Sequence, residues 1–379
     1  LARTRSFDGR KVDERVQLEL PLGRAPPQGA IISLLAVVRL PRTPSGGGFD
    51  ERRWLRRQGV HVVLDVDEWH RVGARGGLAG AADALRRWLR RACAPGLAGE
   101  RRAVVEGVVL GDDAGLSDGL KASFRRSGLY HLLAVSGQNV VLLAGGVLVL
   151  VWSLGLPRAC GHVGALVAIG AYVLAVGPQP SVIRAAVSGV AVSVAWLGSR
   201  ERDPWHVLGL AAVVLLAANP YAVFDPGFQL SFAAVVAIFV GVPPLLRVLE
   251  GYPVPPKLAV ALAVSTACSV ATAPILWLQF GSVPVLGVIA NAIVEPAVAP
   301  LLGLALVSAA VDPVSPSLAA ALASLNGWVA AYTAGCARAV GALPFAQVGG
   351  RQAALVVAGV LMAGAYAWRR WRTSSNRPI

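Results

Sequence analysis

The chain has 379 residues, of which 55% are hydrophobic and only 15% are charged, whereas an ordinary soluble domain has about 25% charged residues. The formal net charge is +14, and most charged side chains lie in the first third: residues 1–126 hold 23 of the 35 Lys and Arg and 15 of the 21 Asp and Glu. This distribution excludes a single soluble domain and indicates a polar N-terminal part followed by a membrane part.

Residues 1–76 are predicted to form a small OB-like β-barrel domain. Pro- and Gly-rich stretches separate three strand-like segments, which are RVQLELPL, AIISLLAVVRLP and GVHVVLDVDEW. The basic residues at the start have no apolar stretch behind them, so we expect no signal peptide. A start at Leu1 without methionine suggests a truncated chain or a missing upstream membrane anchor.

Arginines cluster in a predicted helical turn within GGGFDERRWLRRQG, and again in an amphipathic helix that opens the segment 77–126, a linker into the membrane part. Two interpretations of the first cluster stay open. Arginine neutralises the phosphates of single-stranded nucleic acid while an aromatic ring stacks on a base. Alternatively, the cluster is a solvated face or lies on anionic lipid headgroups. The residues concerned are Arg52, Arg53, Trp54, Arg56 and Arg57.

Residues 127–370 are predicted to form a polytopic α-helical membrane domain. A spanning helix needs about 20 mostly apolar residues, and about nine stretches qualify: 130–154, 160–177, 180–198, 204–218, 228–248, 258–279, 284–310, 317–341 and 353–368. The seventh stretch contains Pro296 and Pro300 well inside it. We therefore predict one broken or re-entrant helix that lines a cavity.

The cations of the short loops indicate an orientation. If the N-terminal domain lies outside, the outer loops GPQP, NPYAVFDPG and QFGSVPV carry no Lys or Arg. The cytoplasmic loops then carry Arg158, Arg200, Arg202, Arg247 and Lys257, and residues 371–379 form a basic cytoplasmic tail. We predict a multi-pass protein of the plasma membrane, with its N-terminal domain outside and its C-terminus in the cytoplasm.

Polar side chains inside membrane helices are costly and usually face a cavity or a partner. Arg184 stands out, and two roles stay open for it: it reaches the interface as a snorkelling cation, or it binds an anion in a polar path, paired with Glu295 or Asp225. The polar residues in the apolar stretches include His131, Ser136, Gln138, Asn139, Ser181, Arg184, Asp225, Gln229, Ser231, Asn291 and Glu295.

Catalytic motifs are missing from the sequence. HExxH and GxxxxGK[ST] do not occur, and the four cysteines form no CxxC pair. His131 and Ser136 are five residues apart and would point in different directions on a helix, which argues against a catalytic pair. We predict no enzymatic activity, no cofactor and no metal site.

Long blocks of the sequence resemble the ComEC/Rec2 family of competence proteins. FRRSGLYHLLAVSGQNV is similar to a family signature, and three later blocks follow in the same order: GPQPSVIRAAVSG, NPYAVFDPGFQLSFAAV and FGSVPVLGVIANAIVEPAVAPL. GGFDERRWLRRQG and LGDDAGLSDGLKASFRRSG resemble the OB-like region of the family and its linker. Together these blocks are spread over residues 47–301 of the chain.

The resemblance implies a channel that carries single-stranded DNA across the cytoplasmic membrane during natural transformation. It implies contacts with membrane lipids, a DNA receptor and cytoplasmic DNA-processing proteins. Many relatives carry a metallo-β-lactamase-like domain whose metal motif this sequence lacks, so strand degradation would belong to a separate nuclease. The positions in matching blocks that would line the DNA path are His131, Ser136, Gly137, Asn139, Ser181, Arg184, Asp225, Gln229, Ser231, Asn291 and Pro296.

Two other functions stay open. The same polar residues would suit a permease for a small anionic or lipid-linked substrate, and a third alternative is a membrane scaffold of an uptake complex.

Overall fold

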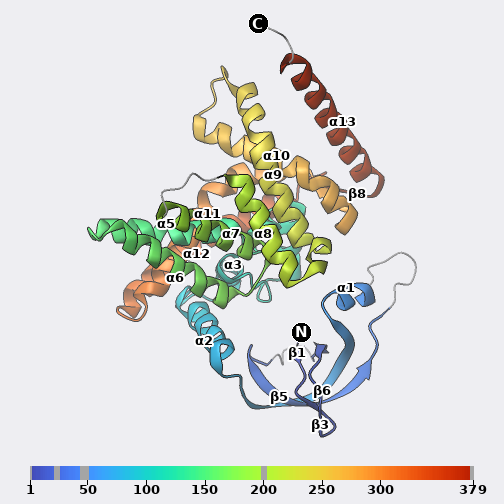
Figure 1. The fold of residues 1–379 in the computed structure, drawn as a ribbon, viewed down its shortest axis with the longest axis vertical. Coiled ribbons are helices and arrows are strands. Elements are labelled where there is room, and N and C mark those ends of the chain that lie inside the picture. The colour runs from blue at the N-terminus through green and yellow to red at the C-terminus, as the bar shows by residue number, and fades with distance from the viewer. Residues whose placement is uncertain (1, 21–25, 43–50, 198–202, 376–379) are drawn as a thin grey trace. The chain divides into compact units, whose positions relative to one another are not determined.

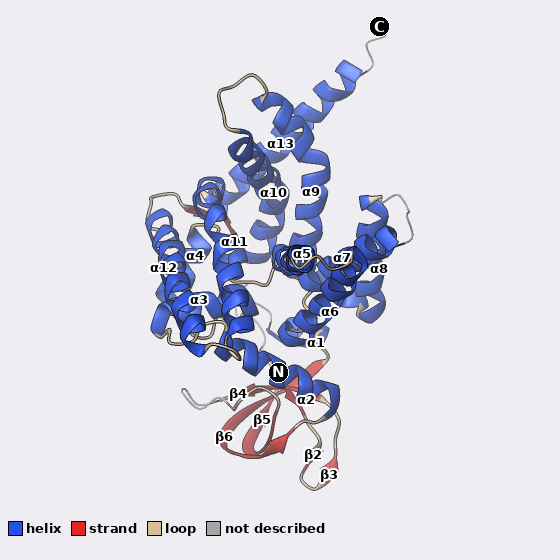
Figure 2. Cartoon of the chain, turned by 90° about the vertical axis from the view of Figure 1, so that its left-hand side faces the viewer, coloured by secondary structure: helices blue, strands red, loops and turns tan. Residues whose placement is uncertain are grey.

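The computed structural model describes residues 2–20, 26–42, 51–197 and 203–375. Contacts divide the chain into two compact units, Leu1–Ala84 and Leu85–Ile379. The first unit is built on a β-sheet, and the second is almost entirely helical (Figures 1 and 2).

The first unit contains a curled, mixed four-stranded sheet (Figure 1). The strands β4 and β6 pair in parallel and the other pairs are antiparallel. Two register irregularities between β5 and β6 increase the local twist. Among the described residues no pairing joins the two edge strands, so the closed OB-like barrel stays a prediction. The order is β1 (Ala2–Arg3), β4 (Arg15–Glu19), β6 (Val60–Ala74) and β5 (Ala30–Arg39).

A hairpin of β2 (Ser6–Phe7) and β3 (Arg10–Lys11) adjoins this sheet in the chain. It turns through Asp8 and Gly9, whose φ angles are 48° and 73°. Positive φ at both central residues is the geometry of a type I′ turn, which an Asp-Gly pair favours.

An arginine fixes three strands of the sheet. Arg39 on β5 pairs with Glu19 on β4, and its Nε lies 3.0 Å from a carboxylate oxygen of Asp65 on β6. Its Nη1 lies 3.9 Å from Glu51 in α1 (Glu51–Arg57). Opposite charges matched across neighbouring strands stabilise their register.

The helix α1 occupies the predicted arginine-rich turn. Leu55 is fully buried against Val60 and Val63. Arg52 is half-buried and Arg56 is exposed. The remaining residues of the cluster have side chains outside the described part of the structure: Arg53, Trp54 and Arg57.

In the second unit, a helix occupies each of the predicted apolar stretches. Within the described residues, four helices are long and apolar enough to cross a membrane, namely α6, α9, α10 and α11, and α5, α7 and α8 are shorter apolar helices. The helices are α5 (Gly137–Ser153), α6 (Arg158–Val176), α7 (Pro180–Leu197), α8 (Pro204–Ala218), α9 (Pro226–Leu249), α10 (Pro256–Phe280), α11 (Gly287–Val311), α12 (Pro316–Gly341) and α13 (Gly350–Ser375).

Short elements complete this unit. A 3₁₀ turn, η2 (Pro220–Phe224), precedes α9, and β7 (Ser282–Pro284) pairs with β8 (Gln347–Gly349). The helices α9 and α10 lie side by side (Figure 2). They approach closely because Gly241 has no side chain; a Cβ there would lie 3.1 Å from the Cβ of Ala267.

The core of the second unit surrounds α3 (Gly99–Leu110), a helix within the segment predicted as a linker. Every residue from Ala103 to Leu110 is buried, and α11 and α12 pack against this helix. The charged residue in this run, Glu106, is paired with Arg90 (3.0 Å) and Arg102 (2.7 Å). The same segment contains α2 (Gly77–Ala92) and α4 (Asp118–Arg126).

The first predicted membrane stretch begins later than residue 130, which corrects that prediction. Residues 130–132 form a 3₁₀ turn, η1, and Ser136 is extended (φ −104°, ψ 163°) before α5 begins at Gly137. The apolar residues ahead of α5 are buried in the protein core, and hydropathy does not distinguish such burial from contact with lipid. They are Leu129, Leu132, Leu133 and Val135.

The predicted break in the seventh stretch is also wrong, because α11 continues through Pro296 and Pro300. Proline removes a backbone donor and disturbs the carbonyls of the preceding turn. In a membrane helix, neighbouring helices can supply the missing bonds. Pro296 removes the donor to the carbonyl of Ala292, and the hydroxyl of Tyr332 on α12 donates to the next carbonyl along the chain, that of Ile293, at 3.0 Å.

We expect Phe124→Ala to destabilise the second unit strongly. Phe124 on α4 is fully buried in the core, and emptying such a site costs about 3–5 kcal/mol. Phe280→Ala is the control, because that ring is 60% exposed. Thermal unfolding of the solubilised protein should show a clear drop in Tm for Phe124→Ala only, and equal Tm values would contradict the assignment of this core.

Candidate functional site

The residues that precede and begin α5 contact four neighbouring helices. Successive residues of a helix point about 100° apart, so Gly137, Gln138 and Asn139 face different partners. Gly137 faces α7, Gln138 reaches α11, and Asn139 reaches α3 and α6. We call residues Ser136 to Asn139, with the side chains that contact them, the α5 junction.

Asn139 holds the end of α3. Its side chain is only 3% exposed, and its Nδ2 donates to the carbonyl oxygen of Val108 (2.7 Å) and to the hydroxyl of Tyr172 (3.2 Å). The hydroxyl of Ser136 donates to its Oδ1 at 3.1 Å. The Tyr172 hydroxyl in turn donates to the carbonyl oxygen of Val109 at 2.6 Å. Carbonyls in the last turn of a helix lack partners within the helix, and these side chains supply them.

Arg184 lies directly against Gly137. A Cβ on Gly137 would lie 3.0 Å from Nη2 of Arg184. The guanidinium is half-buried, and its Nε donates to the hydroxyl of Ser231 on α9 at 2.8 Å. Among the described residues no carboxylate lies within 4.0 Å of it, so the predicted pairing with Glu295 or Asp225 is wrong. The structure leaves this cation a neutral partner.

Glu295 and Gln138 are polar residues of the site that the family blocks did not select. The Nε2 of Gln138 donates to Oε1 of Glu295 at 2.9 Å, which joins α5 to α11. Glu295 is exposed on a helix that is long and apolar enough to cross a membrane. The cost of placing a carboxylate in such a helix was the signal that marked it.

The other predicted residues form separate contacts. The hydroxyl of Ser181 donates to the carbonyl oxygen of Val135 (2.6 Å), which ties the start of α7 to the junction. His131 lies outside α5, in η1, and its Nδ1 bonds to the carbonyl oxygen of Gly128 at 2.9 Å. Pro296 is exposed beside Glu295.

The remaining candidates lie on α9, α10 and α11. Asp225 is the N-cap of α9 and accepts from the backbone N–H of Gly227 at 2.7 Å. Gln229 accepts from Nε2 of Gln279 on α10 at 3.0 Å. Asn291 donates to the hydroxyl of Ser265 at 3.1 Å, between α11 and α10. Asp225 caps its own helix, the Gln229 and Asn291 contacts join neighbouring helices, and none of these hydrogen bonds involves Arg184, so the structure groups only part of the predicted set.

Reactive groups are few in the described part of the chain. No cluster of three or more His, Cys, Asp or Glu that could hold a metal is found there. Cys93 is fully buried, and burial raises the pKa of its thiol to about 12. Because the thiolate is the reactive form, this thiol is not a nucleophile at neutral pH.

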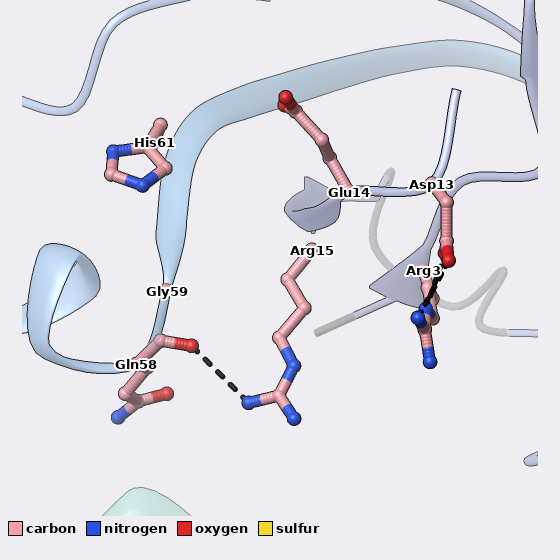
Figure 3. Close-up of a pocket in the computed structure, with 7 residues that line it drawn as sticks. All are labelled: Arg3, Asp13, Glu14, Arg15, Gln58, Gly59 and His61. Carbon is pink, nitrogen blue, oxygen red and sulfur yellow. Dashed lines mark hydrogen bonds and ion pairs between the residues drawn. The ribbon is translucent and has the colours of Figure 1, made fainter.

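A pocket of about 420 Å³ lies on the first unit (Figure 3). In it Arg3 pairs with Asp13, and Nη1 of Arg15 donates to the carbonyl oxygen of Gln58 at 3.3 Å. The hydrogen bond with Arg3 lowers the pKa of the Asp13 carboxyl. The arginines of the pocket thus already have partners.

We expect Tyr172→Phe to destabilise the packing of α6 against the end of α3. The change leaves the buried carbonyl of Val109 without its donor, and an unsatisfied buried polar group costs about 1–3 kcal/mol. Tyr221→Phe is the control, because Tyr221 is 61% exposed. Thermal unfolding should show a lower Tm for Tyr172→Phe than for Tyr221→Phe; matching Tm values would show that this hydroxyl does not hold the helix.

Comparison with known proteins places the chain. The family model described as "Competence protein" matches residues 108–373. The chain is 31% identical over 188 residues to ComE operon protein 3 of Bacillus subtilis, covering 49% of this chain and 24% of the relative. It is 27% identical over 263 residues to competence protein ComA of Neisseria gonorrhoeae, covering 66% and 36%.

An uncharacterized protein of Escherichia coli, YcaI, is 28% identical over 144 residues, which cover 36% of this chain and 19% of that protein. No solved structure matches the chain. In all three relatives, the part aligned with this chain is about a fifth to a third of the relative's length. Because the family model covers well over half of the chain, this membrane protein belongs to the ComEC/Rec2 family of competence proteins.

Proposed function

We propose that the second unit forms a path for single-stranded DNA through the cytoplasmic membrane, and that it performs no chemical reaction on the strand. Family membership supports a role in DNA uptake. The observation that carries the proposal is Arg184, a half-buried cation among apolar helices with no carboxylate partner among the described residues.

Arg184 has N–H donors that remain available to bind a phosphate. The guanidinium has five N–H donors, and its Nε is bonded to a neutral hydroxyl, that of Ser231. Arg binds phosphate through two parallel charge-assisted hydrogen bonds. Conduction also requires that such binding stay weak enough for the strand to leave, and a single cation meets that condition better than a cluster.

The remaining parts of the proposal concern topology and partners. We place the first unit outside the cell, where it would receive the strand, and the C-terminal end of α13 in the cytoplasm, because the basic loops favour this orientation. The partners would be single-stranded DNA, membrane lipids, a DNA receptor and separate DNA-processing proteins. A permease for a small anion also fits an unpaired Arg184, so the substrate has to be tested directly.

We expect Arg184→Gln to reduce transport of 5′-labelled single-stranded DNA into proteoliposomes by at least about tenfold, because a charge-assisted hydrogen bond contributes about 1.5–3 kcal/mol. Arg247→Gln is the control: Arg247 is exposed in the last turn of α9, and its removal changes the net charge equally. Normal DNA transport by Arg184→Gln would refute the role of this residue. Transport of inorganic phosphate without DNA would favour the permease.

We also expect Gly137→Ala to impair DNA transport without destabilising the fold. The new methyl group would displace only the mobile end of Arg184, which costs little energy but moves the guanidinium. Gly145→Ala is the control on the same helix, since a Cβ at Gly145 meets nothing within 4 Å. Transport and Tm should be measured together. Equal transport by both variants would show that the position of the guanidinium does not matter.

A further inference from the structure

Two charged residues stand apart from all others in the apolar helices. From α5 to α11, Arg184 and Glu295 are the only Lys, Arg, Asp or Glu residues beyond the first and last turns of the described helices. The other described charges in this region lie at helix ends or in loops, where water or headgroups can solvate them. An opposite pair inside such helices would be expected to form an ion pair, yet these two do not lie within 4.0 Å of each other.

The first turn of α5 separates the two charges. Gly137 lies against the guanidinium of Arg184, and the next residue, Gln138, is bonded to the carboxylate of Glu295. Gly137 and Gln138 are consecutive residues that point about 100° apart, so one helix turn carries the contact to each charge and keeps the two charges on different sides of it. Each charge has a neutral hydrogen-bond partner, Ser231 for the cation and Gln138 for the anion.

The exposure of Glu295 indicates a polar environment at the α5 junction. A carboxylate on the outside of a membrane helix does not face lipid tails, because the energetic cost is too high. Glu295 is exposed, and Gln138 beside it is half-buried. The side of α11 that carries Glu295 therefore faces water or a polar ligand, close to the turn that also contacts Arg184.

We propose that Glu295 limits how tightly and how long a phosphate is held at Arg184. The inference rests on the proposed function and assigns Glu295 a part in it: release of the strand. A carboxylate near a bound phosphate repels it, and between charges near a protein surface this repulsion changes affinity on the order of tenfold. A path needs sites that ions can both enter and leave. Arg184 attracts the phosphate, and Glu295 keeps this binding weak enough for the phosphate to be released.

The test uses the full chain in lipid nanodiscs and two probes, a labelled 20-nucleotide dT strand and inorganic pyrophosphate. The variants are Glu295→Gln, Arg184→Gln and the double variant. Gln keeps the shape of Glu and can still accept from Gln138. Glu250→Gln is the control, because Glu250 is an exposed carboxylate at the C-cap of α9 and its loss changes the net charge equally.

Glu295→Gln should lower the dissociation rate of the dT strand about tenfold, with a matching fall in Kd. In the Arg184→Gln background the same change should have less than about a twofold effect. Tighter binding is the opposite of what damage to the fold would give. Unchanged or faster dissociation, or an equal effect in Glu250→Gln or in the Arg184→Gln background, would overturn the proposal.

The two probes separate this inference from the proposed function. If pyrophosphate dissociates more slowly from Glu295→Gln, and only when Arg184 is present, while the dT strand does not bind, the role of Glu295 in release is supported and DNA is excluded as the substrate. If the dT strand binds and Glu295→Gln does not change its dissociation rate, the DNA path is supported and the role of Glu295 in release is refuted. If the wild-type chain binds neither probe, both are overturned.

Discussion

The backbone carbonyls at the end of α3 must be hydrogen-bonded inside an apolar core, and the packing around the α5 junction follows from this requirement. A helix that ends in water can leave its last carbonyls to the solvent, but α3 ends among buried residues. Asn139 on α5 and Tyr172 on α6 supply the donors. Two helices are thereby fixed against a third through side chains that would be costly to bury alone.

The same constraint explains why three polar residues and a glycine are adjacent in the sequence. Ser136 bonds to Asn139, which bonds to the protein interior, Gly137 leaves space for a guanidinium, and Gln138 donates to a carboxylate. A polar residue at each position would be unfavourable in a helix surrounded by lipid. In a helix surrounded by protein on several sides, each residue faces a different partner, so one turn organises both the structural and the charged part of the site.

Much of this arrangement could be predicted from the sequence, and the exceptions have physical reasons. Runs of apolar residues marked the positions of α5 to α13, and the cost of burial marked Arg184, Asn139 and Glu295. Hydropathy did not separate burial in protein from burial in lipid, so the start of α5 was placed too early and the central position of α3 was missed. Partners were also missed: Arg184 bonds to Ser231 on a helix that begins about 40 residues later, and sequence spacing carries no information about such contacts.

The prolines of α11 were misread for a related reason. Proline disturbs the carbonyls of the preceding turn, and the sequence of α11 does not show that Tyr332 on another helix donates to a carbonyl of that turn. Residues on the first unit show the opposite case. The three strand-like segments predicted there contain β4, β5 and most of β6, because residue alternation and the flanking Pro- and Gly-rich stretches are local features of the sequence.

The position of α3 at the core has a consequence for how the protein is made. This helix is synthesised early, but α11 and α12, which cover it, begin about 180 and 200 residues later. At about 5–20 residues per second, translation leaves α3 without these partners for on the order of ten to forty seconds. During that time the part of its valine-rich surface that α11 and α12 later contact is uncovered. Completion of the core therefore depends on the last third of the chain, and the nascent protein is most vulnerable to aggregation before α12 has emerged from the ribosome.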